Sequence, residues 1–204
     1  MLRKILVCLL LPLFLAACGA QGAWAPDEAV RQARYTTGEQ PSITLFTVIG
    51  IPRGEGAHSA LMIDGSQRVM FDPAGTWNHP AVPERNDVHY GITPMIKAFY
   101  IDYHARQTYY VEEHKVFVSP EVAELAIRRA EAYGAVPKAM CANATSTVLR
   151  GLPGFESISG SFYPLRVRDS FAALPGVVKK THHDGDPDNN HNVLLVQKGQ
   201  LGVR

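Results

Sequence analysis

Residues 139–150 read AMCANATSTVLR, and this stretch decides the fold because it predicts a helix that begins at Cys141. Pro137 lies just upstream, where it disfavours a helix that is already running. Gly151 and then Pro153 end the helix after its apolar last turn. The sequence therefore predicts a short helix with a thiol in its first turn.

A thiol in the first turn of a helix lies near unpaired backbone N–H groups and the positive end of the helix dipole. Both stabilise the thiolate, which is the nucleophilic form of cysteine. A lone cysteine is more commonly a small buried hydrophobe. Three features favour the nucleophile at Cys141: it is the only thiol expected in the mature domain, it begins a helix, and a histidine precedes it on a predicted strand.

The N-terminus has the pattern of an export signal. The basic residues 3–4 precede an apolar run, 5–14, that is too short for a usual membrane-spanning helix. LAAC at residues 15–18 resembles the bacterial lipobox, which implies cleavage before Cys18 and lipidation of that cysteine. Gly19 then favours the outer membrane over inner-membrane retention. The alternative is an ordinary secretory signal with a chance cysteine.

Composition and charge limit the classes of function. Cleavage before Cys18 would leave 187 of the 204 residues, with 18 basic and 19 acidic side chains. This balance gives no basic surface for nucleic acid. Cys8 is removed and Cys18 is lipidated, so Cys141 has no partner for an intramolecular disulfide. The length suits one domain with its own core.

Hydrophobic periodicity and turn residues divide the chain into a signal peptide (1–17), a lipid anchor and tether (18–40) and one domain (41–204). Strands are expected at 42–49, 58–63, 67–72, 108–118 and 192–197. Helices are expected at 26–33, 92–104, 120–133, 141–149 and 170–174. Residues 73–91 are rich in Pro, Gly and Asn and are expected to be irregular.

The strand His58-Ser59-Ala60-Leu61-Met62-Ile63 precedes the helix that opens Cys141-Ala142-Asn143 and ends Val148-Leu149. This order resembles the circularly permuted NlpC-type branch of the papain-like superfamily, which includes lecithin:retinol acyltransferase and many bacterial exported hydrolases. The resemblance covers roughly residues 42–152. It implies an α+β, papain-like fold in which a small, mainly antiparallel sheet packs against the cysteine helix.

The resemblance also implies a mechanism without metal or organic cofactor. Cys141 attacks an acyl carbonyl, and His58 takes the thiol proton and later protonates the leaving group. Members of the branch often carry Asn just before the cysteine, where this chain has Met140, which leaves the Cys141 backbone N–H as the oxyanion donor. The alternative is that His58 is only a surface residue at the end of a strand.

A third polar group would orient the imidazole, and we place it at Asp72. The branch puts such a residue, often a histidine, on the strand after the histidine strand. A hairpin centred on Gly65 pairs positions 58 and 72 and puts both side chains on one face, whereas a two-residue turn at 65–66 does not.

Two alternatives to this role of Asp72 remain open. Asp72 begins the sequence Asp72-Pro73-Ala74-Gly75, and starting a turn is a common role of aspartate before proline. His79 and His89 lie in the irregular segment and are substitutes for the third group.

Other polar clusters fit structural roles better. Residues 182–191 contain Asp184, Asp186 and Asp188 in a calcium-loop spacing, but the required glycine and closing glutamate are missing, so we expect a solvated loop. Residues 112–114 are expected on a solvated strand face, and Tyr100 in the core or a cleft wall.

The sequence thus predicts an envelope cysteine hydrolase that is anchored to the membrane through Cys18 and cleaves an amide or ester. Its substrate would be a small molecule, a peptide or a lipid. Acyl transfer by the same Cys–His pair, or ligand binding by a catalytically silent lipoprotein, are the alternatives.

Overall fold

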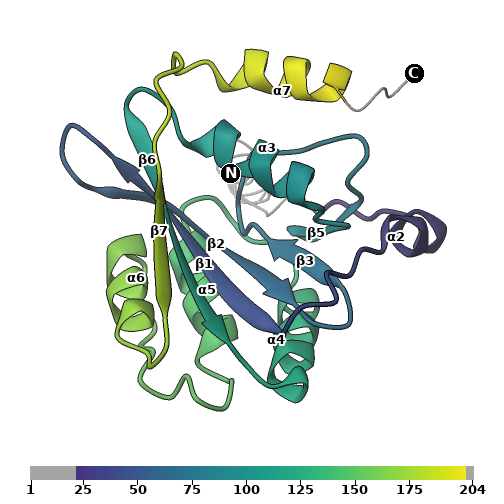
Figure 1. Ribbon diagram of the computed structural model, residues 1–204, viewed down its shortest axis with the longest axis vertical. Coiled ribbons are helices and arrows are strands. Elements are labelled where there is room, and N and C mark those ends of the chain that lie inside the picture. The colour runs from purple at the N-terminus through teal and green to yellow at the C-terminus, as the bar shows by residue number, and fades with distance from the viewer. Residues whose placement is uncertain (1–21, 201–204) are drawn as a thin grey trace, which may run out of the picture.

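The computed structural model describes residues 22–200, which form an α+β fold built on one seven-stranded antiparallel sheet with the strand order β4-β5-β3-β2-β1-β6-β7 (Figure 1). The strands are β1 (Ser42–Gly50), β2 (Gly56–Asp64), β3 (Arg68–Phe71), β4 (Glu84–Arg85), β5 (Val88–Tyr90), β6 (Tyr109–Phe117) and β7 (Val178–His182). The helices are α2 (Asp27–Ala33), α3 (Pro94–His104), α4 (Pro120–Tyr133), α5 (Cys141–Leu149), α6 (Pro164–Ala172) and α7 (Asn190–Gln200). Within this range, no helix has the length and apolarity needed to cross a bilayer.

Helices cover both faces of the sheet (Figure 1). On one face, α4, α5 and α6 pack on alternate residues of the central strands, such as Leu45, Leu61 and Phe71. On the other face, α3 and α7 cover the intervening residues, such as Phe46 and Met62. Because side chains alternate along a strand, β1 is buried on both faces, which explains its continuous apolar sequence.

The two edges of the sheet are protected differently. At the β4 edge, the N-terminal stretch pairs with the sheet, since Ala25 N–H donates to Glu84 O (2.9 Å) and Trp24 forms a β-bridge with Arg85. Further along, Tyr35 O accepts from the N–H of Arg68 (2.8 Å). The described part of the expected tether is therefore fixed to the domain. At the other edge, β7 exposes lysines, which discourage pairing with another chain.

Most expected elements occur within two residues of the expected bounds, including the helix that begins at Cys141. The expected strand at 192–197 is wrong, because this stretch lies in α7, where Val193 and Leu194 pack against the α3 side of the core. β7 was missed, because its residues are exposed and polar. The segment 73–91, expected to be irregular, contains the short strands β4 and β5, and the helix expected at 170–174 begins already at Pro164.

Residues 112–114 do not form a solvated face, because all three side chains are buried. Glu112 forms ion pairs with Arg168 (2.8 Å) and with Lys179 (2.5 Å). Glu113 bonds likewise to a lysine of α3 and a histidine of β7. Sequence periodicity missed these pairings because the partners lie far away in the chain.

Candidate active site

Cys141 is the first residue of α5, and its side chain is almost fully buried. His58 lies close enough to the thiol to lower its pKa, and the backbone N–H groups of Ser59 and Ala142 act in the same direction. A bond between the Ser59 and Thr145 hydroxyls (3.1 Å) holds β2 against α5. The start of the helix thus meets the histidine strand with the thiol directed at the imidazole.

His58 bonds on its other side to Asp72, with 2.6 Å between His58 Nε2 and Asp72 Oδ1. The Asp72 carboxylate is fully buried, and the His58 side chain is 14% exposed. Because Nε2 faces the carboxylate, Nδ1 is the nitrogen left for the thiol. The structure therefore brings together Cys141, His58 and Asp72, with a hydrogen bond between His58 and Asp72 and the thiol beside the imidazole.

The hairpin that joins β2 and β3 reaches this arrangement through a register that differs from the expected one. Asp64 pairs with Arg68, so the turn has three residues, 65–67. Continued along the strands, this register puts Asp72 opposite Ala60, two residues from His58 and on the same face. Both registers considered for the hairpin were thus wrong, but a shift of two residues preserves the face that the contact requires.

Asp72 also begins a turn, so the two roles considered for it occur together. Its backbone carbonyl accepts from Gly75 N–H (3.0 Å), with Ala74 in the left-handed region (φ 57°). Its carboxylate accepts a second hydrogen bond at Oδ1, from the Tyr100 hydroxyl (2.8 Å). Asp72 Oδ2 is buried and has no hydrogen-bond partner within residues 22–200.

The charged forms of Cys141, His58 and Asp72 stabilise one another. Burial opposes a charge on His58, but Asp72 outweighs it and raises the pKa of His58 to about 10. Burial likewise disfavours the carboxylate, yet His58 holds the pKa of Asp72 well below its usual range. For Cys141, burial favours the thiol, but the hydrogen bond and charge of His58 dominate and lower the pKa of the thiol. The arrangement thus favours a thiolate–imidazolium pair near neutral pH.

A cleft of about 320 Å³ opens beside His58. Its walls include His58, Gly75, Thr76, Tyr103, His104 and Asn190. Burial lowers the pKa of His104 to about 4, so this ring is neutral near pH 7. A larger hollow of about 530 Å³ lies between α3 and β7, but His58 does not line it. Cys141 lines neither space, so His58 is the reason to assign the chemistry to the smaller cleft.

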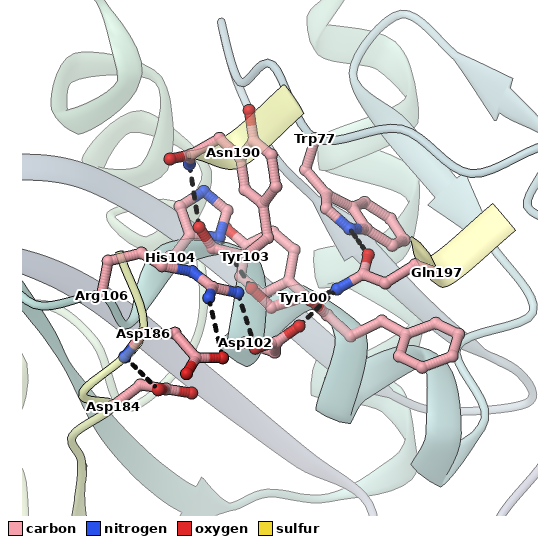
Figure 2. Close-up of polar contacts among 11 residues, drawn as sticks. Trp77, Tyr100, Asp102, Tyr103, His104, Arg106, Asp184, Asp186, Asn190 and Gln197 are labelled. Atoms are coloured by element: carbon pink, nitrogen blue, oxygen red, sulfur yellow. Dashed lines mark hydrogen bonds and ion pairs between the residues drawn. The ribbon is translucent and has the colours of Figure 1, made fainter. Parts of the chain in front are cut away.

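Helix α7 contributes Asn190 to the lining of the cleft, and polar side chains hold the helix to its neighbours (Figure 2). The buried side chain of Gln197 accepts from Trp77 Nε1 (3.3 Å) and donates to Asp102 Oδ2 (2.9 Å). At the start of the helix, Asn190 donates to Tyr103 O (2.9 Å), as Figure 2 shows. These contacts fix the C-terminal segment along α3.

Some of the candidate residues from the sequence lie away from the group formed by Cys141, His58 and Asp72. His79 bonds to Gln197 O (3.2 Å), and His89 lies edge-on to Trp77, so neither replaces Asp72. Met140 packs into the core and offers no oxyanion donor. The contact from Tyr100 to Asp72 was not predicted, although the helical spacing of apolar residues in α3 indicated the buried face of that helix.

Among residues 22–200, two groups of side chains have metal-ligand atoms within 4.8 Å of one another. One group comprises His58, Asp72 and His104. In this group, Asp72 already accepts hydrogen bonds from His58 and Tyr100. The other comprises Asp102, Asp184 and Asp186, and the Arg106 guanidinium pairs with Asp102 (2.6 Å) and Asp186 (3.4 Å), as Figure 2 shows. Protein groups therefore already bond to members of both sets.

Gly75 is required by the close approach of the Asp72 carboxylate. A Cβ at position 75 would lie 1.8 Å from Asp72 Oδ2, so Gly75→Ala must displace the carboxylate from His58. We expect this variant to lose Cys141 alkylation by iodoacetamide at low pH and to melt at a lower temperature. Gly185→Ala is the matched control, because a Cβ there meets nothing within 4 Å. Native alkylation in a folded Gly75→Ala protein would contradict the assigned packing.

Comparisons of the chain with protein-family models, curated proteins and solved structures find no match. The geometry of the site therefore carries the functional argument alone.

Proposed function

We propose that this protein is a cysteine hydrolase that cleaves an amide or ester bond, with Cys141 as nucleophile, His58 as general base and acid, and Asp72 as the orienting group. The observation that carries the proposal is the placement of the Cys141 thiol beside His58, whose Nε2 is hydrogen-bonded to the buried carboxylate of Asp72. Cys141 begins α5, so the helix dipole stabilises its thiolate in addition to the charge of His58.

In the first half of the reaction, the thiolate attacks the carbonyl carbon and forms a C–S bond. The negative charge moves to the carbonyl oxygen, where the backbone N–H of Cys141 at the helix start is the proposed donor. As the bond to the leaving group breaks, the His58 imidazolium protonates that group. A thioester on Cys141 and a neutral His58 remain.

In the second half, His58 removes a proton from water, whose oxygen attacks the thioester carbonyl. The C–S bond breaks, the acid leaves and the thiolate–imidazolium pair is restored. Asp72 holds Nε2 of His58 throughout, so that Nδ1 stays directed at the reacting groups. An acyltransferase would use the same steps with another nucleophile in place of water.

The proposed fold is the papain-like fold of the permuted NlpC type. The seven-stranded antiparallel sheet, the thiol at the start of a packed helix and the histidine strand earlier in the chain support it. A thiol-reactive probe separates the enzyme from a silent binding protein. An enzyme should be labelled at Cys141 much faster than free cysteine, whereas labelling slower than free cysteine would contradict the proposal.

The proposed location is the cell envelope, with a lipid on Cys18. The lipobox at 15–18 and Cys18 lie outside the described residues, so the sequence pattern carries this part. Three residues separate Cys18 from Gly22, so the four steps between their Cα atoms span at most about 14 Å. Gly22 lies near Asn86 and Ala135, at the end of the sheet that also carries Asp72, so the anchor would hold the site close to the membrane.

Replacing Cys18 with serine should release the mature protein from the membrane, because the acyl chains supply the anchor. Membrane fractionation and incorporation of labelled palmitate measure this result in native and Cys18→Ser protein. A Cys141→Ser variant is the control and should remain anchored. Membrane association of Cys18→Ser, together with no palmitate in the native protein, would contradict the anchor.

A further inference from the structure

His104 lies in the last turn of α3, one helical turn after Tyr100. Its Nδ1 bonds to the Tyr100 carbonyl (2.8 Å), which fixes the orientation of the ring. The ring also packs against the rings of Tyr100 and Tyr103, with centroid distances of 4.3 and 4.9 Å. The thiol mechanism described above does not use this well-held side chain.

The same ring lies beside the His58–Asp72 pair. The planes of His104 and His58 are within 6° of parallel, with centroids 5.5 Å apart. Both histidines line the cleft, whereas the carboxylate of Asp72 is fully buried. The ring of His104 therefore adjoins the ion pair where it borders the solvent-filled cleft.

The charged and titratable groups that face His58 come from three places. Asp72 follows β3, Cys141 begins α5, and Tyr100 and His104 lie on α3. A neutral His104 excludes water without adding a charge that would repel the imidazolium. Water near an ion pair weakens it, because the attraction falls as the local dielectric constant rises. Water also relieves the burial that opposes the charge on His58, so the shield matters where the lost attraction to Asp72 is the larger effect.

We propose that His104 is a positioning residue, whose ring shields the His58–Asp72 ion pair from the water and ions of the cleft. This inference rests on the proposed thiol mechanism, because the shielded pair is the one that maintains the thiolate of Cys141. The contact surface of the ring provides the effect, and its ring nitrogens are dispensable for it.

The test compares native protein with His104→Ala, which removes the ring, and His104→Phe, which keeps a ring without nitrogens. His183→Ala, at an exposed histidine beside Tyr110, is the control. The measurement is the rate of Cys141 alkylation by iodoacetamide against pH, at low and high salt. We expect His104→Ala to lose about tenfold at low pH, which corresponds to one pKa unit, and to become salt-dependent. His104→Phe and His183→Ala should keep the native profile.

A native profile in His104→Ala would overturn the proposal, and so would a His104→Phe profile that matches His104→Ala. If His104→Ala does not fold, His104→Gln removes the ring while keeping a polar side chain, and it should show the same loss. An NMR titration of the His58 ring provides a readout that is independent of the thiol. A lowered His58 pKa in His104→Ala supports the shield, whether or not native Cys141 is reactive. An unreactive native Cys141 contradicts the proposed function instead. An unchanged His58 pKa overturns the shield.

Discussion

Replacing Cys141 with alanine should abolish both turnover and labelling by thiol-reactive probes, because the C–S bond of the proposed intermediate can no longer form. Removing the nucleophile from a comparable catalytic unit costs roughly 10⁶-fold in turnover. The measurement is hydrolysis of a panel of amide and ester substrates, including peptides and lipids, by native and Cys141→Ala protein. It also identifies the class of substrate.

The alanine variant should fold, because the thiol is a small group and α5 is held by apolar packing and by the Ser59–Thr145 bond. Circular dichroism and thermal melting check this. A folded Cys141→Ala protein that retains native turnover would contradict the proposed nucleophile. Native protein that is inactive on every substrate but labels rapidly would still have an activated thiol.

Replacing Asp72 with asparagine should remove the reactivity of Cys141 at low pH. The carboxylate raises the pKa of His58 to about 10 against the opposing effect of burial. Without it, burial lowers the His58 pKa, and a neutral imidazole no longer stabilises the thiolate. The pKa of Cys141 then rises, so alkylation at about pH 6 should fall by up to about tenfold for each pKa unit of the shift.

Native protein should alkylate from the lowered pKa of Cys141 upward, with the thiolate–imidazolium pair retained until His58 loses its proton near pH 10. Alkylation at high pH should persist in Asp72→Asn, because a free thiolate forms there without help. Asp102→Asn provides a control carboxylate on α3, whose partners are Arg106 and Gln197. A native pH profile in folded Asp72→Asn would remove Asp72 from the chain and leave a Cys–His dyad.

Local sequence signals were sufficient to predict the helix and strands that position Cys141, His58 and Asp72. Pro137 and Gly151 delimit the helix that begins at Cys141, and the apolar sequence of β1 indicates a buried central strand. The family resemblance suggested the contact between His58 and Asp72, which needs both side chains on one face of the sheet. That condition survives a register shift of two residues.

Local sequence patterns could not predict the long-range contacts. The helical state of residues 190–200 depends on packing against α3 and on the buried Gln197, and no nearby residue indicates these partners. The role of His104 likewise depends on a ring that the fold brings beside His58 from 46 residues away in the sequence. Propensity and periodicity describe single segments, whereas these side chains acquire their surroundings from several.

The most direct test of the central claim is the pH titration of the Cys141 thiolate, followed by its ultraviolet absorbance with Cys141→Ala as the blank. The account predicts that the native thiol deprotonates below the ordinary cysteine pKa of about 8.5. It also predicts that His58→Ala raises this pKa, because the hydrogen bond and charge of His58 stabilise the thiolate. A native thiol that titrates at or above the ordinary value, with no change in His58→Ala, would contradict an activated Cys141.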